Sequence, residues 1–162
     1  MTGRYVGLTT AVVTDNDDPE GRCRIKVDVP ELLLDGSTGW CQPALPYAGN
    51  SCGFAVVPPI GAVVFVQWPN GDLTAPPVWS GATFSGVDDG VPGAGPNTVI
   101  LLTPGGHRLE LNDDTQALTI KASGGAELTL DSSGITVDNG QGATIAMQGA
   151  SVNINDGALQ VM

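Results

Sequence analysis

The feature that most constrains this chain is a series of apolar triplets after Thr98, each consisting of two apolar residues separated by one other residue. Side chains alternate between the two faces of an extended strand, so a triplet places both apolar side chains on one face. The starts of successive triplets lie 9, 10, 7, 10, 7 and 7 residues apart. The seven triplets are Leu109/Leu111, Leu118/Ile120, Leu128/Leu130, Ile135/Val137, Ile145/Met147, Val152/Ile154 and Leu159/Val161.

Gly, Asn and Asp fill most of the gaps between these triplets, as in Asp138-Asn139-Gly140. An irregular repeat of minimal strands and turns predicts a β-solenoid or β-prism, whereas a two-sided sandwich needs longer strands. A single chain with so few triplets would have two open ends and little core. Three copies winding around one axis would give every strand edge and every triplet a partner. We therefore predict that residues 98–162 form an intertwined homotrimeric shaft with the triplets as its core.

The first half of the chain contains period-two strands separated by turn residues. In Arg22 to Val29 the charged side chains fall on one face, and Cys23, Ile25, Val27 and Val29 fall on the other. Residues 17–21 supply the Pro and Gly of a tight hairpin that joins this strand to one over residues 6–14. Further strands are predicted over residues 39–45, 53–57 and 62–68, with residues 77–80 as a closing segment.

Short antiparallel strands packed into so little sequence predict an OB-type barrel. The stretch that follows it is rich in Gly, Pro and Asp and is typical of a connector. We predict an all-β chain with a barrel over residues 1–82, a connector over 83–97 and the shaft over 98–162.

The charge balance bears on possible partners and on the compartment. Six basic and 17 acidic residues give a net charge of -11, which would repel a nucleic acid backbone. No apolar run approaches the roughly 20 residues that span a bilayer, and no signal peptide is visible, so we expect synthesis in the host cytoplasm. Cys23, Cys41 and Cys52 are odd in number and lack CxxC spacing, which favours plain thiols, with their redox state open.

Candidate chemistry is sparse. The only histidine is His107, which a Ser/His/Asp arrangement would have to recruit from the start of the shaft. The pairs Asp17-Asp18 and Asp113-Asp114 lack the series of oxygen ligands that a calcium loop requires. We therefore predict no catalytic residue, no cofactor and no metal, and a protein that is not an enzyme. Trp40, Trp68 and Trp79 could form a ligand platform on the barrel, although core packing or contact with a partner is the preferred interpretation.

The order of barrel and shaft resembles the central spike proteins of contractile injection machines, namely phage baseplate spikes and the spike part of type VI valine-glycine repeat proteins. Residues 18–27 look like the family's Asp-Pro-x-Gly-(x)-Arg-Val-Lys-Val hairpin. Further similar segments are Pro30-Glu31-Leu32, Trp40, Pro46-Tyr47-Ala48-Gly49, Gly53-Phe54, Pro58-Pro59-Ile60-Gly61, Gly71-Asp72, Pro76 to Gly81, Thr103 to Leu109 and Asn155 to Val161.

This resemblance implies a membrane-piercing baseplate spike in a virion or injection particle, whether a phage, a bacteriocin-like particle or a secretion system. Residues 81–97 are too few for the lysozyme domain that some phage spikes carry. The resemblance also implies a separate hub protein at the barrel end, where Trp40 and Phe54 are the expected contacts. It further implies a tip protein of the proline-alanine-alanine-arginine repeat class, carrying its own metal, on Asn155, Asp156, Leu159, Val161 and Met162.

Two alternatives belong to other classes. A trimeric β-helix acyltransferase also has short aliphatic strands, but the triplet spacing contradicts its six-residue period. A carbohydrate-binding trimeric tail fibre is the second alternative, and the barrel-first order argues against it.

Overall fold

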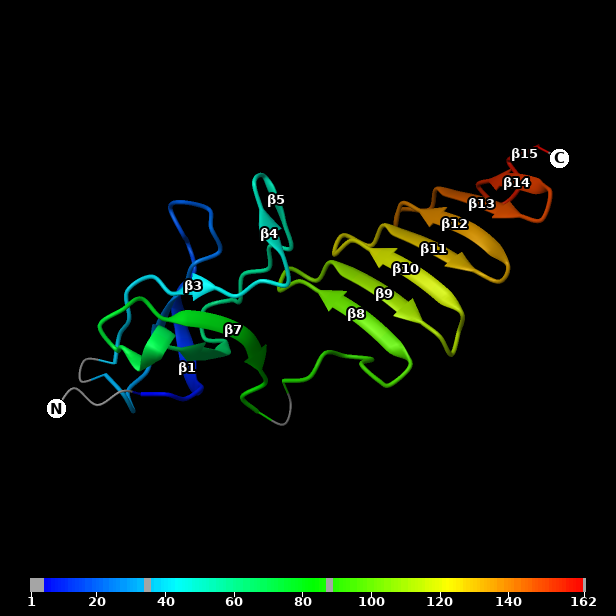
Figure 1. Ribbon diagram of the computed structural model, residues 1–162. Coiled ribbons are helices and arrows are strands. Elements are labelled where there is room, and N and C mark those ends of the chain that lie inside the picture. Colours follow the sequence, from blue (N-terminus) through cyan, green and yellow to red (C-terminus); the bar gives the residue numbers. More distant parts are fainter. Residues whose placement is uncertain (1–4, 34–35, 87–88, 162) are drawn as a thin grey trace. The chain divides into compact units, whose positions relative to one another are not determined.

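The computed structural model describes residues 5–33, 36–86 and 89–161, and the chain divides into two compact units, Met1–Asp89 and Gly90–Met162 (Figure 1). Over the described residues the regular structure is almost entirely β-strand, and the one helical element is a 3₁₀ turn, η1 (Pro69–Gly71). The prediction of an all-β chain is confirmed. Among the described residues, no helix has the length and apolar character needed to cross a membrane.

The first unit contains a five-stranded sheet in the order β2-β1-β6-β7-β3, in which only the β3–β7 pair is parallel. Bridges from Ile25 to Cys41 and from Asp28 to Ser37 join the segment before β3 to the β2 strand. Because these bridges link the two edges of the sheet, the strands close into a barrel. The strands are β1 (Thr9–Asp15), β2 (Lys26–Asp28), β3 (Gln42–Pro43), β6 (Val63–Gln67) and β7 (Val78–Thr83).

The core of the barrel follows from the alternation of side chains along its strands. Residues at every second position of β1 and β6 point inward, whereas their neighbours point out. The buried apolar residues are Ala11, Val13, Ile25, Val27, Val29, Cys41, Val64, Val66, Trp68 and Trp79.

Arg24 departs from the predicted pattern, in which every charged residue of this strand faces water. Its side chain is only 10% exposed, and its Nη2 lies 2.6 Å from Oδ1 of Asp18, whose side chain is 4% exposed. The Asp18 carboxylate also accepts hydrogen bonds from the backbone N–H groups of Glu20, Arg22 and Arg24. The Arg24 guanidinium, followed by these backbone donors, holds the pKa of Asp18 well below its ordinary value of 3.8. The expected solvated turn carboxylate is therefore half of a nearly buried ion pair beneath an exposed turn.

The prediction of a barrel strand over residues 53–57 is wrong. Only Gly53 of that range is in a strand, and it belongs to a separate two-stranded hairpin of β4 (Ala48–Gly49) and β5 (Cys52–Gly53). Pro58 and Pro59 follow this segment, and proline has no N–H to donate to a sheet ladder.

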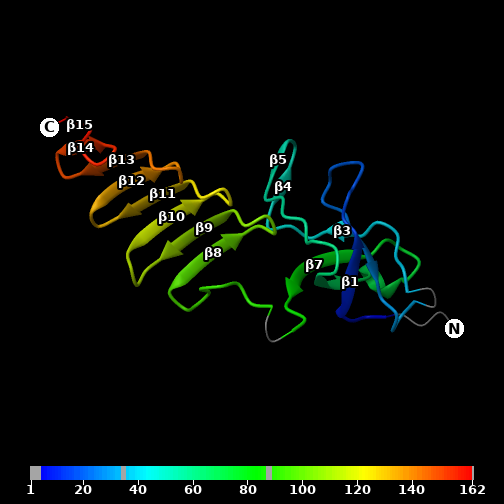
Figure 2. The same cartoon turned by 180° about the vertical axis from the view of Figure 1, so that it is seen from behind.

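The second unit is one sheet of eight antiparallel strands in sequential order from β8 to β15 (Figure 1). Seen from behind, it remains a single layer, with no other element of this unit on either face (Figure 2). The strands are β8 (Thr98–Leu102), β9 (Arg108–Asn112), β10 (Ala117–Lys121), β11 (Glu127–Asp131), β12 (Gly134–Asp138), β13 (Thr144–Gln148), β14 (Ser151–Ile154) and β15 (Leu159–Val161).

Short turns hold this meander together. The Asp131 carboxylate accepts hydrogen bonds from the backbone N–H and hydroxyl of Ser133 and from the N–H of Gly134. Gly134 has a φ of 143°, and a Cβ added there would lie 1.9 Å from the carbonyl oxygen of Met147, so only glycine fits. The inner strands pair within the chain, which differs from the expectation that other copies pair every edge. Only β8 and β15 have a free edge in this sheet.

Candidate functional site

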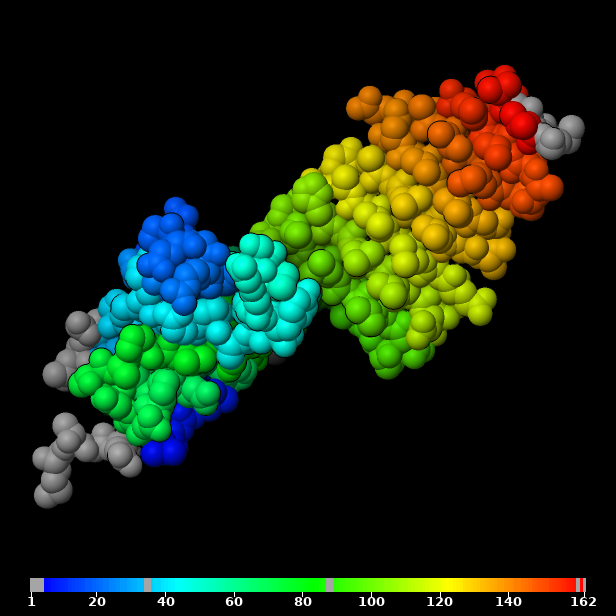
Figure 3. Space-filling model, turned by 45° about the horizontal axis from the view of Figure 1, so that its top comes forward, coloured from blue at the N-terminus to red at the C-terminus, as the bar shows by residue number. Residues whose placement is uncertain are grey.

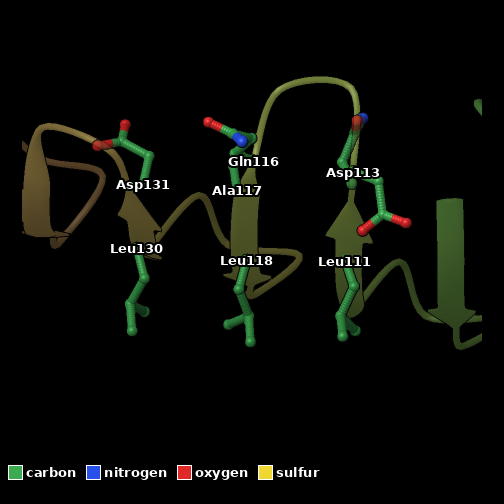
Figure 4. A pocket seen from close by; sticks show the side chains of 8 residues that line it. Leu111, Asp113, Gln116, Ala117, Leu118, Leu130 and Asp131 are labelled. Carbon is green, nitrogen blue, oxygen red and sulfur yellow. The ribbon is translucent and has the colours of Figure 1, made fainter. Parts of the chain in front are cut away.

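The register of the eight-stranded sheet places the predicted triplet residues opposite one another. Leu118 of β10 faces Leu111 of β9 on one side and Leu130 of β11 on the other. Figure 4 shows these three leucines pointing the same way from three neighbouring strands. The same correspondence continues strand by strand to the end of the sheet.

Two unbroken rows of apolar residues result, both on one face, which we call the apolar face. The first row is Val99, Leu111, Leu118, Leu130, Ile135, Met147, Val152 and Val161. The second row is Leu101, Leu109, Ile120, Leu128, Val137, Ile145, Ile154 and Leu159. All 14 predicted triplet residues lie in these rows.

Strand β8 was missed as a triplet strand. Val99 and Leu101 have the same spacing as the other triplets, but they lie inside the continuous aliphatic run Val99 to Leu102, which hides the alternation. Their pairing with Leu111 and Leu109 shows that they extend both rows by one strand.

The apolar face has no cover within the chain. Of the described residues from Gly90 to Val161, none is buried, and Val99 and Leu101 are 67% and 49% exposed. A shallow hollow at the ends of strands β9, β10 and β11 is lined by Leu111, Leu118 and Leu130 together with Asn112, Asp113, Gln116, Ala117 and Asp131 (Figure 4). A continuous apolar surface of this kind marks a site of interaction with another molecule.

The opposite face is mostly polar, and its central row runs from Ile100 through Glu110, Thr119, Thr129, Thr136 and Ala146 to Asn153. Ion pairs join Arg108 to Glu110 at 2.7 Å and Lys121 to Glu127 at 3.0 Å on this face. Hydrogen bonds from Asn112 and then Arg108 lower the pKa of Glu110. One face thus suits water and the other suits a partner.

The predicted tip residues lie at the last turn and strand. Asn155 and Asp156 both have positive φ, and Asn155 Oδ1 accepts a hydrogen bond from the Thr144 backbone N–H at 2.9 Å. Leu159 and Val161 are exposed on β15, which pairs only with β14 in this sheet. The predicted contact at Met162 lies outside the described residues.

The residues considered for catalysis or metal binding do not come together in one site. His107 accepts a hydrogen bond at Nδ1 from the Ser123 backbone N–H at 3.4 Å, and Asp114 accepts one from Asn97 at 2.7 Å. In the described part of the chain, no three His, Cys, Asp or Glu residues gather as a metal-binding group would. All three cysteines are free: Cys41 is buried, Cys23 is half-buried and Cys52 is exposed.

The three tryptophans of the barrel do not form an exposed platform. Trp79 is buried and donates from Nε1 to the Cys23 carbonyl oxygen at 3.0 Å, and buried Trp68 meets Tyr5 edge to face at 6.4 Å. Trp40 is half-buried, with Lys26 Nζ 4.5 Å from its ring centroid. A small hollow beside it is lined by Trp40, Trp68 and apolar residues of the 73–77 loop, among others.

Trp40 and Phe54, predicted together as hub contacts, lie on different elements. Trp40 immediately precedes Cys41, which bridges to the barrel core, whereas Phe54 follows β5 on the separate hairpin and is exposed.

Comparison with known protein families gives two matches in the order of the two units. Residues 9–84 match the type VI secretion system/phage-baseplate injector OB domain, and residues 98–160 match the phage baseplate V C-terminal trimerisation domain. A search of curated proteins found no match. The first match accounts for the closed barrel, and the second accounts for a sheet whose apolar face has no cover of its own. The chain belongs to the baseplate spike family of phage and type VI injection machines, with the injector OB domain followed by the trimerisation domain.

Proposed function

We propose that this protein is the central, membrane-piercing spike of a contractile tail or injection-system baseplate and that it acts mechanically, without catalysis. The family matches support a structural role in the baseplate of a virion or injection particle. In this proposal, contraction of the sheath drives the spike into the envelope of the target cell. Synthesis takes place in the host cytoplasm before assembly.

The uncovered apolar face carries the proposal. Burial of apolar surface contributes roughly 25 cal/mol per Å², so a sheet with two apolar rows is stabilised strongly by a partner that covers them. The trimerisation-domain match supports three copies as that partner. Three sheets around one axis would turn their apolar rows inward and their polar rows outward, as an intertwined β-helical prism. A prism filled by side chains has no cavity to collapse under load.

The partners at the two ends are also proposals. A separate hub protein would bind the barrel, with Trp40 and Phe54 as the predicted contacts. A separate tip protein with its own metal would cap Asn155, Asp156, Leu159, Val161 and Met162. The exposed apolar residues and free edge of β15 support such a cap.

The barrel is proposed as an adaptor rather than a nucleic-acid reader. OB-fold barrels can bind oligonucleotides, but a net charge of -11 opposes the neutralisation of phosphates on which such binding depends. We expect no measurable affinity for single-stranded DNA at physiological salt. Tight, salt-sensitive binding would contradict the adaptor role.

Complementation tests the proposed function. In a producing strain that lacks this gene, the wild-type chain should restore particle assembly and killing of the target cell. Ile154→Asp should restore neither, because it would place three carboxylates inside the prism. Asn153→Asp, one position away in the polar row, should restore both. Normal particles from the strain without the gene, or equal activity of the two variants, would refute the proposal.

A further inference from the structure

The β4–β5 hairpin stands apart from the barrel sheet, and we call residues Pro46–Val57 the arm. Its two strands pair only with each other, and the Phe54 N–H extends the ladder by donating to the Tyr47 carbonyl oxygen at 3.2 Å. Every residue of the arm is exposed. Figures 1 and 2 show it extending away from the rest of the first unit, and Figure 3 shows its surface in cyan.

One face of the arm is apolar. Its register places Tyr47, Phe54 and Cys52 on the same side, because Tyr47 faces Phe54 and Gly49 faces Cys52. Tyr47 is 60% exposed and Phe54 is 49% exposed. An isolated two-stranded hairpin is marginally stable in water, so an arm that exposes aromatic rings requires a surface to pack on.

The barrel of the same chain has a second apolar surface, which we call the outer face. Val12 of β1 faces Val63 of β6, and Thr10 faces Phe65, all on the side opposite the buried residues. Val12 is 43% exposed, and Leu8 immediately before this strand is 56% exposed.

Charge points to another copy of the chain as the occupant. No charged residue occurs from Gly36 to Gly71, which includes the whole arm and β6, or from Tyr5 to Thr14, which includes the rest of the outer face. Copies that each carry a net charge of -11 repel one another over most of their surface. The arm and the β1–β6 part of the outer face are where such copies can approach closely, because the cores of protein interfaces are depleted of charge. Asp28 of β2, which faces Val12, lies at the charged rim of the outer face.

Three-fold symmetry explains why the chain has two different surfaces. Away from the axis of a three-fold ring a patch cannot meet its own copy, so a contact there requires two distinct complementary patches on each chain. We propose that, in the homotrimer proposed above, the arm of each copy packs its apolar face on the outer face of the next copy. The three arms then form a collar around the barrels. Phe54 thereby belongs to the collar, and Trp40 alone remains as a predicted hub contact.

Cys52 near the tip of the arm provides the test. The variant Thr10→Cys places a thiol on the outer face at an exposed position. Mild oxidation of the purified full-length trimer should give covalently linked trimers on a non-reducing gel. Adding Cys52→Ser should abolish these products, and adding Phe54→Ser should slow their formation by at least about fivefold, which is the loss of roughly 1 kcal/mol of packing. Asp17→Cys, exposed on the β1–β2 loop, should not give linked trimers.

The oligomeric mass of each variant, measured before oxidation, separates the two proposals. A native trimer that gives no linked product with Thr10→Cys would overturn the collar, and the arm would then be available to the hub. Equal linking by Thr10→Cys and Asp17→Cys would also overturn it. A protein that is monomeric before oxidation would overturn the homotrimer itself.

Discussion

The barrel and the eight-stranded sheet contain the same kinds of aliphatic side chains but differ in how they cover them. Every buried residue among those described lies in the barrel, where Val13, Val27 and Val64 are at most 1% exposed. The sheet has more strands and two longer apolar rows, yet it buries none of its described residues. Regular strands therefore do not by themselves make a core, which needs a second layer or closure of the sheet.

The difference has a physical consequence. A closed barrel covers its core side chains with its own strands, so the burial of that core does not depend on protein concentration. A single-layer sheet gains its burial on association, so its stability is coupled to assembly. The same comparison holds within the first unit, where the arm resembles the sheet more than the barrel that carries it.

The largest effect is expected from a charge in the apolar rows. Ile135 faces Leu130 and Met147, and Ile135→Asp would bring three carboxylates together at the axis of the trimer. An uncompensated buried charge costs several kcal/mol, so the dissociation constant should rise by more than about 100-fold. Size-exclusion chromatography with light scattering should show monomers.

Thr136→Asp is the matched control for that variant, because Thr136 is the next residue and lies in the polar row. It should remain trimeric at the same concentration. Equal loss of trimer in both variants would mean that the apolar face is not the interface.

A cavity in the barrel core should lower the stability of the first unit without weakening the trimer. Ile25 is fully buried, and Ile25→Ala should lower the free energy of unfolding of the barrel by about 2–5 kcal/mol. Urea unfolding followed by tryptophan fluorescence measures this change, since all three tryptophans lie in the first unit. The trimer mass should not change under native conditions. Dissociation of the Ile25→Ala trimer would show that trimer formation depends on the stability of the barrel core.

Asp18→Asn should have a smaller, pH-dependent effect on the barrel. It removes the nearly buried one of the two carboxylates that pair with Arg24 and leaves the exposed Glu20 at 3.0 Å, so we expect the melting temperature at neutral pH to fall by about 5 °C. Because folding lowers the pKa of Asp18, its carboxylate stabilises the barrel above the ordinary value of 3.8, and this stabilisation is lost as the pH falls toward the folded pKa. Acidification below about pH 4 should therefore destabilise the wild type more than the variant.

The exposed neighbour Asp17 provides the control for this experiment, because Asp17→Asn changes the same charge without touching Arg24. A melting temperature for Asp18→Asn that equals that of Asp17→Asn would show that the buried pair does not stabilise the barrel.

The smallest effect is expected on the polar face of the sheet. Lys121 pairs with Glu127, but its side chain is 51% exposed. Lys121→Ala should change stability by less than about 0.5 kcal/mol and leave the trimer intact, because exposed ion pairs contribute little. Dissociation of the Lys121→Ala trimer would indicate that the polar face, and not the apolar face, forms the interface.

The alternation of apolar and polar residues along the chain predicted the strands and which of their faces is apolar. The triplets gave strands β9–β15 and their shared face, and alternation in residues 25–29 gave the buried side of the barrel. The burial of Arg24 was not predictable in this way, because it depends on Asp18 meeting it across a hairpin. Residues 53–57, the second half of the arm, were mistaken for a barrel strand, because a short apolar run does not specify whether it pairs with the barrel sheet or with a neighbouring hairpin strand.

The mass of the native protein tests the central claim most directly, namely that the apolar face of the second unit is covered by two further copies of the same chain. Native mass spectrometry of the purified full-length chain, repeated over a dilution series, measures it without mutation. The account predicts one dominant species of three chains that persists on dilution. A stable monomer at every concentration would contradict it.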